Sequence, residues 1–102
     1  MKLHWSERAL MDVEHLRDYI AQDSPFYARQ FIERLLTRLE NLPTFPRMGR
    51  SVPEAESEDV REIVYQGYRV IYRLKAGVIE IAAVVHGSRD LAGTADKPWT
   101  GG

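Results

Sequence analysis

Arginines and one histidine in the C-terminal half of the chain have side chains that could act on a phosphodiester. His86 ends an apolar run, and Arg89 follows three positions later. An imidazole titrates near neutral pH and can serve as a general acid or base, while guanidinium groups stabilise the charge that develops on a phosphate during cleavage. The candidate catalytic residues for RNA cleavage are Arg61, Arg73, His86 and Arg89, with Arg69 as a further phosphate ligand and Tyr65 as a stacking or proton-transfer group.

The same side chains also fit a surface that binds another macromolecule without chemistry. The segment from Arg61 to Lys75 holds four basic residues and one acidic residue, a local charge of +3 on a chain whose net charge is −1. His86 lacks an evident acid–base partner, so a histidine that ends a strand through a hydrogen bond is the simpler interpretation of it. The candidate binding residues are Arg61, Tyr65, Arg69, Arg73, Lys75 and Arg89. The residues by themselves leave both interpretations open.

Length and composition restrict the class of protein. A chain of 102 residues with 44% hydrophobic and 28% charged residues fits one globular domain, which we expect over residues 1–92, with a flexible tail over 93–102. Cysteine is absent, and His4 and His15 are too scattered to indicate a metal site, so we expect neither metal nor cofactor. No apolar run approaches the about 20 residues of a membrane span, which favours a soluble cytoplasmic protein.

Two helices are predicted after a short strand in the first five residues. Ser6 is a suitable N-cap for a helix from Glu7 to Ala21, and Pro25 suits the first position of a second helix. Apolar residues of the second helix recur at steps of three and four: Ala28, Phe31, Ile32, Leu35, Leu36, Leu39 and Leu42. The prolines of "LPTFP" end this helix. The two helices should form an antiparallel hairpin with a shared apolar face.

Three strands are predicted in the second half, after a solvated loop over Pro43–Asp59 that contains the acidic run "EAESED". The first strand begins at Val60 and ends before a turn at Gly67. The second covers Tyr68–Lys75, and the third covers Val78–His86 after a turn at residues 76–77. The fold class is therefore α+β, with the order β-α-α-β-β-β and a mainly antiparallel sheet.

One face of this sheet is predicted to stay open. In the second strand Arg69, Arg73 and Lys75 alternate with apolar residues and share a face. A helical hairpin covers only one face of a small sheet, and the apolar residues belong against it. The basic face is therefore expected to remain available to a macromolecular partner.

The sequence resembles the ParE branch of the RelE/ParE toxin superfamily. The similarity is carried by "WSERA", by "FPRMGRSVPE" with Pro46, Gly49, Arg50 and Pro53, and by Arg61, "GYRVIYR" and "VVHGSRD". It implies the fold given above and a cognate antitoxin, ParD-like or RelB-like, which wraps and neutralises the toxin. The complex is expected to bind operator DNA through the antitoxin. ParE-like members inhibit DNA gyrase without enzymatic activity, whereas RelE-like members cut messenger RNA on the ribosome.

Three departures from the RelE-like pattern favour the ParE-like function. The chain is slightly acidic, no tyrosine follows His86, and the loop before Val60 is acidic where RNA-cleaving relatives often carry lysines. The resemblance therefore implies a gyrase-directed toxin. Two alternatives remain, a ribosome-dependent endoribonuclease that uses the candidate catalytic residues, and a non-toxic member that only binds the antitoxin.

Overall fold

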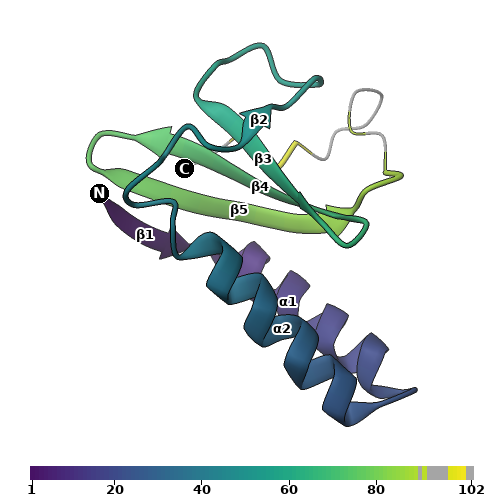
Figure 1. Cartoon of the computed structure of the whole chain (residues 1–102). Helices are drawn as coiled ribbons and strands as arrows, with labels where there is room; N and C mark the ends of the chain where they lie inside the picture. The colour runs from purple at the N-terminus through teal and green to yellow at the C-terminus, as the bar shows by residue number, and fades with distance from the viewer. Residues whose placement is uncertain (90, 92–96, 101–102) are drawn as a thin grey trace.

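Both helices begin at a serine that caps them, and the cap of the first helix, Ser6, is the one that the sequence predicts. The computed structural model describes residues 1–89, 91 and 97–100. Helix α1 covers Glu7–Ala21 and α2 covers Pro25–Leu39. The hydroxyl of Ser6 accepts the backbone N–H of Ala9 at 3.0 Å, and that of Ser24 accepts the N–H of Tyr27 at 3.1 Å. The helices lie side by side on one side of the sheet (Figure 1). Among the described residues, no helix has the length and apolarity that crossing a membrane requires.

The sheet has five strands in the order β1-β5-β4-β3-β2. The strands are β1 (Lys2–Trp5), β2 (Arg50–Ser51), β3 (Val60–Tyr65), β4 (Tyr68–Lys75) and β5 (Val78–His86). Strand β1 pairs with β5 in parallel, and the other pairs are antiparallel. The predicted α+β class and element order are confirmed. The short β2 lies inside the segment predicted to be loop, and it was not predicted.

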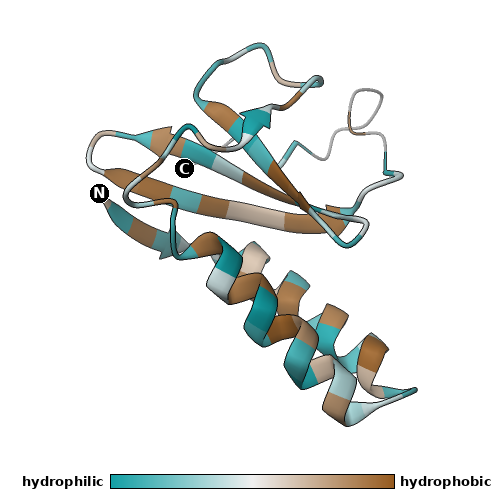
Figure 2. Ribbon diagram, viewed as in Figure 1, coloured by the Kyte–Doolittle hydropathy of each residue, from teal (hydrophilic) through white to brown (hydrophobic). Residues whose placement is uncertain are grey.

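The main hydrophobic core lies between the helices and the sheet. Leu35 of α2 and Tyr72 of β4 are fully buried in it. Strand β5 is coloured as apolar along most of its length, whereas β2 is coloured as hydrophilic (Figure 2). A central strand covered on both faces is apolar on both faces. Burying these side chains supplies most of the stabilising free energy of the fold.

A β-bulge interrupts β5 opposite the middle of β4. Ile71 pairs with Ala83 but Tyr72 pairs with Ile81, so Ala82 is an extra residue on β5. The N-cap of α1 supplies a hydrogen bond to the backbone of the extra residue. The hydroxyl of Ser6 donates to the carbonyl oxygen of Ala82 at 3.0 Å. The bulge inverts the alternation of inward and outward side chains along the rest of β5.

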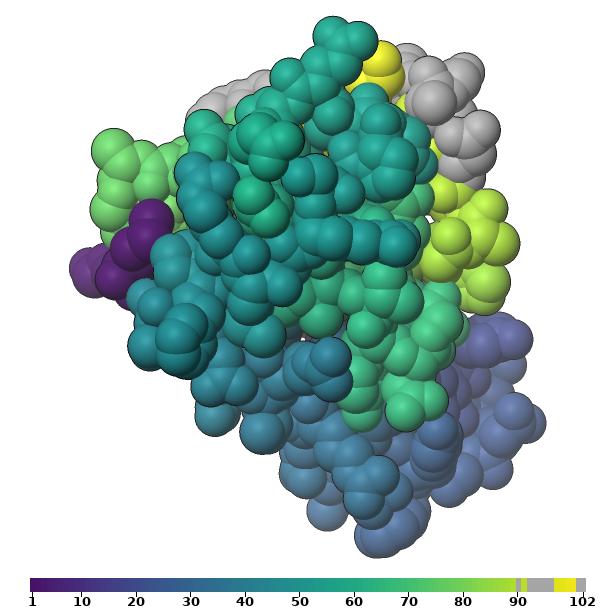
Figure 3. Space-filling model, turned by 45° about the horizontal axis from the view of Figure 1, so that its top comes forward, coloured from purple at the N-terminus to yellow at the C-terminus, as the bar shows by residue number. Residues whose placement is uncertain are grey.

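The other face of the sheet is also covered by the chain. A second hydrophobic cluster comprises the buried residues Val52, Val60, Ile71, Ala83, Val85 and Leu91, with Ala55 and Trp99 packed against it. Figure 3 brings the loop before β3 forward, and its teal atoms occupy the centre of that view with yellow C-terminal atoms at their edge. Trp99 belongs to the segment predicted to be a flexible tail; residues 93–96, 101 and 102 of that segment lie outside the described residues.

Candidate functional site

A buried carboxylate holds two of the arginines on the face predicted to be open. The side chain of Glu62 in β3 has no solvent exposure. One of its oxygens accepts from Nε of Arg69 at 2.6 Å, and the other accepts from Nε of Arg50 at 2.6 Å. A buried charge requires such partners, because an unpaired one would be strongly destabilising.

Glu54, in the acidic loop before β3, is a second carboxylate that binds Arg69. Arg50, Glu54, Glu62 and Arg69 together form the arginine network. Both oxygens of Glu54 accept from Arg69, at 2.9 Å from Nη1 and 2.7 Å from Nη2, in a bidentate pair. The backbone N–H of Leu91 donates to the same carboxylate at 3.2 Å. The hydrogen bonds from Arg69 lower the pKa of Glu54 to about 2, and the pairing raises the pKa of Arg69. Only 7% of the Arg69 side chain is exposed to solvent.

Arg61 secures the same loop at its start. Its Nη1 donates to the carbonyl oxygen of Gly49 at 2.8 Å, and its Nε donates to that of Glu58 at 3.0 Å. Beside it the hydroxyl of Tyr72 accepts the N–H of Gly49 and donates to the carbonyl oxygen of Pro46 at 2.8 Å. A Cβ on Gly49 would lie 2.6 Å from the Glu62 carbonyl oxygen and from the Tyr72 hydroxyl, so the close approach requires glycine. Burial raises the pKa of Tyr72.

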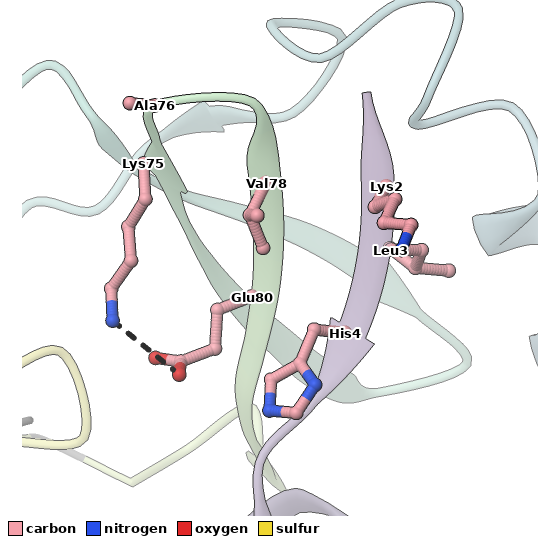
Figure 4. A pocket seen from close by; sticks show the side chains of 7 residues that line it. All are labelled: Lys2, Leu3, His4, Lys75, Ala76, Val78 and Glu80. Carbon is pink, nitrogen blue, oxygen red and sulfur yellow. Dashed lines mark ion pairs between the residues drawn. The ribbon is translucent and has the colours of Figure 1, made fainter.

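Glu80 of β5 pairs with the two remaining basic residues of β4. Its Oε1 accepts from Nε of Arg73 at 2.7 Å, and its Oε2 lies 3.7 Å from Nζ of Lys75. Arg73 also donates to the carbonyl oxygen of Trp99 at 2.8 Å. Beside this pair lies a hollow at the β1 edge, where Figure 4 shows His4 next to Glu80. Within the described part of the chain, no three His, Cys, Asp or Glu side chains are placed to hold a metal ion.

The prediction of an open basic face is therefore wrong. Arg69 is buried, Arg61 and Arg73 have side chains that are only 14% and 17% exposed, and all three are held by acidic side chains or carbonyl groups of the protein. The loop before β3 folds back because Glu54 and Val52 find partners on the sheet. Whether the named residues contact an antitoxin or a target stays a prediction, but the described structure does not present them as one exposed patch.

His86 lies on the opposite side of the sheet from Arg69 and Arg73. It pairs with Tyr68 across the strands, and the two rings meet edge to face with centroids 5.5 Å apart. Tyr68 in turn contacts Phe31 of α2 at 5.9 Å. The bulge at Ala82 places His86 on the helix-covered side, because Glu80 and His86 would share a face on a regular strand.

The turn after β5 determines the protonation pattern of His86. Its Nδ1 accepts the backbone N–H of Ser88 at 3.2 Å and lies 2.7 Å from the Ser88 hydroxyl. A backbone N–H can only donate, so Nδ1 carries no hydrogen and the neutral ring carries it on Nε2. The prediction of a hydrogen-bonded histidine that ends a strand agrees with this geometry.

The candidate catalytic residues are not brought together. Arg73 lies on the reverse face beside Glu80. Arg61 pairs with Tyr72 and His86 pairs with Tyr68 on the helix-covered face, so these two are separated by four positions along β4. Arg89 follows His86 and is exposed, and Tyr65 is half-buried beside Phe31 with ring centroids 5.4 Å apart. Only His86 and Arg89 of the four line a common cleft.

Sequence reasoning missed the two glutamates of the network. Glu62 carried a usable signal, because a single acidic residue among apolar neighbours in a strand predicts a buried charge with a basic partner. Glu54 carried none, since it lies in an acidic run that resembles any solvated loop.

Comparison with known proteins identifies the family of this chain. Residues 3–91 match the family model of the ParE toxin of type II toxin–antitoxin systems. Toxin RelE2 of Caulobacter vibrioides is 34% identical over 86 residues, which cover 83% of this chain and 93% of that protein. A solved structure of a chromosomal ParDE system from P. aeruginosa has a TM-score of 0.71 at 21% identity, covering 84% of this chain and 95% of that one.

A second solved structure shares the fold with a lower score. The RelBE2 toxin–antitoxin complex of Mycobacterium tuberculosis has a TM-score of 0.54 at 20% identity, and the match covers 83% of this chain and 95% of that one. Both solved structures share the fold of this chain, in which two helices pack on a mixed sheet. The chain belongs to the ParE family of toxins of type II toxin–antitoxin systems.

Proposed function

We propose that this toxin inhibits DNA gyrase, and thereby replication, without enzymatic activity of its own. The proposal rests on the contacts that the basic residues make within the protein. Arg61, Arg69 and Arg73 are engaged by the protein's own carboxylates and carbonyl groups. They therefore hold the loop and the sheet together and are not presented to a phosphodiester.

Ribonuclease activity requires a different arrangement. A general acid or base must come within hydrogen-bond reach of the group whose proton it transfers, with cations beside the developing charge. Arg73 lies on the other face of the sheet from His86. Arg61 pairs with Tyr72, four positions along β4 from the Tyr68 that pairs with His86, so one phosphate could not contact all three. The slight negative net charge also disfavours a ligand as anionic as the ribosome.

The partner in the cell would be a cognate antitoxin, ParD-like or RelB-like. The two solved structures compared above are titled as a ParDE system and a RelBE2 toxin–antitoxin complex. The antitoxin would neutralise the toxin in the cytoplasm, and the complex would bind operator DNA through the antitoxin. Of the residues predicted to contact a partner, Arg89 is exposed and the side chain of Lys75 is 37% exposed. Arg69 is the least accessible, so reversing its charge would test folding and not binding.

A gyrase assay tests the proposal directly. Purified toxin added to a supercoiling reaction should accumulate cleaved DNA, and toxin premixed with its antitoxin should not. The matched reaction contains translating ribosomes with a defined message. Codon-positioned cuts there, with no effect on gyrase, would reverse the assignment in favour of the ribonuclease. Inactivity in both assays with intact antitoxin binding would identify a non-toxic regulatory member.

Two variants distinguish the same alternatives within the toxin. His86→Ala should leave antitoxin affinity intact in either case, and Arg89→Ala should do so if Arg89 acts in catalysis and not in partner binding. Under gyrase inhibition His86→Ala should retain toxicity, since no proton transfer depends on its imidazole. Loss of toxicity in both variants, with unchanged circular dichroism and antitoxin affinity, would contradict the proposal.

A further inference from the structure

Strand β1 is the last strand on one side of the described sheet, and its outer edge carries backbone hydrogen-bonding groups. The N–H of Lys2 donates to the turn before β5 at 3.1 Å, and that of Ser6 donates to β5 at 2.9 Å. Successive residues of a strand point their N–H and C=O groups to alternate sides, so those of Leu3 and Trp5 point away from β5. The backbone groups of these two residues therefore line the free edge.

The opposite edge of the described sheet is too short for such pairing. It is formed by β2, which has only two residues, whereas β1 has four. Proteins commonly shorten an edge strand to prevent it from pairing with another chain. Association through β1 would therefore stop at two copies, because each copy contributes one usable edge.

The two faces of β1 carry different side chains. Leu3 and Trp5 are half-buried against the main core, so part of their apolar surface is still exposed beside the edge. Lys2 and His4 are exposed on the reverse face, next to the hollow of about 790 Å³ at the β1 edge. Figure 4 shows His4 and Glu80, on neighbouring strands, projecting from the same face of the sheet. The hollow leaves room for side chains from an added strand.

A second copy of β1 fits this edge in antiparallel orientation. With a twofold axis at His4, Leu3 of one copy lies opposite Trp5 of the other. These two residues exchange both of their backbone hydrogen bonds, and the equivalent pair across the axis does the same. Their side chains also form an aliphatic–aromatic pair, which stabilises antiparallel strands. Every outward backbone group of Leu3 and Trp5 thereby gains a partner.

The charges beside the edge favour a second copy over a partner strand of one sign. In the antiparallel pair Lys2 lies opposite Ser6, next to the exposed Glu7 that begins α1. The ammonium group of Lys2 thus meets a carboxylate of the other copy. A uniformly basic strand would place its cations beside Lys2, and a uniformly acidic strand would place its carboxylates beside Glu80.

We propose that two copies of this toxin associate through β1, in an antiparallel pair of strands that joins their sheets into one. Because the strand has four residues, the interface is small and the dimer is weak and transient. The association uses neither the arginine network nor the end of β5 at His86. It is independent of gyrase inhibition, so either proposal can fail without the other.

Sedimentation of the free toxin at increasing concentration tests the association. Between about 1 μM and 1 mM, a range that includes the Kd of a weak dimer, the mass should rise from 11.8 kDa toward twice that value. A constant monomer mass would overturn the proposal, and so would continued growth beyond the dimer.

Hydrogen exchange followed by nuclear magnetic resonance tests which edge is used. The amides of Leu3 and Trp5 should exchange more slowly in concentrated than in dilute solution, because only the dimer gives them acceptors. The amide of His4 points toward β5 and should exchange at the same rate in both. A dimer that does not protect the amides of Leu3 and Trp5 has a different interface, which contradicts the proposal.

Two charge variants provide a matched comparison. His4→Glu places two carboxylates opposite each other at the twofold axis, beside Glu80, and should raise the Kd of the dimer about tenfold. The side chain of His4 is exposed, so the fold should be retained, which circular dichroism verifies. His15→Glu makes the same change at an exposed position of α1 beside the other end of β5, and it should leave the Kd unchanged. Equal effects of the two variants, or an unchanged Kd in His4→Glu, would overturn the proposal.

Discussion

The two faces of the sheet are closed by different interactions. Against the helices, aliphatic and aromatic side chains such as Leu35 and Tyr72 form a continuous core. On the reverse face a smaller apolar cluster adjoins an ion-pair network in which Arg69 links Glu54 to Glu62. The stability of the helix-covered face thus depends on the volume and shape of its side chains. The stability of the reverse face also depends on each buried charge having a partner.

This difference predicts how each face tolerates change. Apolar contacts are numerous and individually weak, so removing one side chain leaves a cavity whose size sets the loss. A buried ion pair contributes little net stability when intact but is strongly destabilising when one partner is removed. The reverse face should therefore be the more sensitive to single substitutions of charged residues and the less sensitive to small changes in volume.

Replacing Arg69 should give the greatest loss of stability. Arg69→Met leaves Glu62 and Glu54 close together with one fewer cation, which should lower the free energy of unfolding by about 4 kcal/mol. Urea denaturation followed by circular dichroism measures it. Arg73→Met is the matched control, because Arg73 pairs with one carboxylate, and its loss should be about 1–2 kcal/mol. Similar losses in the two variants would contradict a special role for the network.

Truncating a core leucine probes the helix-covered face. Leu35→Ala should lower the free energy of unfolding by about 3 kcal/mol through lost burial and a residual cavity. The neighbouring Leu36 is 41% exposed, and Leu36→Ala should change stability by less than about 0.5 kcal/mol. The same denaturation experiment compares them, and equal effects would show that the helix does not present Leu35 to the sheet.

Low pH should lower the free energy of unfolding, because it protonates Glu54 on the reverse face. Its pKa is about 2 in the folded protein and 4.5 ordinarily, so the unfolded chain takes up the proton more readily. The ionised Glu54 carboxylate stabilises the fold by about 3 kcal/mol. This contribution is complete above pH 4.5 and is lost as the pH falls toward 2. Glu54→Gln should flatten this part of the stability–pH curve. Glu58→Gln, on an exposed side chain of the same loop, should leave it unchanged. An unaltered slope in Glu54→Gln would refute the assignment.

The smallest effect is expected where α1 meets the bulge. Asp12→Ala removes the acceptor of the Val84 N–H and should cost about 1–2 kcal/mol. Asp12→Asn keeps an acceptor oxygen in place and should cost less than half as much. Thermal unfolding of both variants, with hydrogen exchange at the Val84 amide, makes the comparison. Faster exchange of the Val84 amide in Asp12→Ala, but not in Asp12→Asn, would show that this hydrogen bond protects the part of β5 that follows the bulge.

The elements of the fold could be predicted because their signals are local. Ser6 caps the first helix and Pro25 is the first residue of the second, as predicted. The turns at Gly67 and Gly77 use positive φ angles that glycine adopts readily. The apolar stripe of α2 identified Leu35 as a core residue by its spacing alone. The two-residue β2 carried no such signal, because a strand that short has no periodicity.

The candidate site was the less predictable part. Its basic residues were found by type, but their partners were not, since Glu54 is separated from Arg69 by 15 positions and lies in a loop. The prediction grouped His86 with Arg73 by residue type, and regular alternation along β5 would have put the two on one face, since Glu80 pairs with Arg73. One inserted residue at Ala82 inverted that alternation, and nothing in an apolar run of small and branched residues marks where a bulge falls.

By itself the sequence determined the two helices, the four longer strands and which face of the helices is apolar, because periodicity, caps and turns act over a few residues. Only the tertiary structure decided that the basic face is closed and that His86 lies on the helix-covered side. Those outcomes depend on contacts between segments distant along the chain, where a buried charge takes whichever partner the packing brings to it.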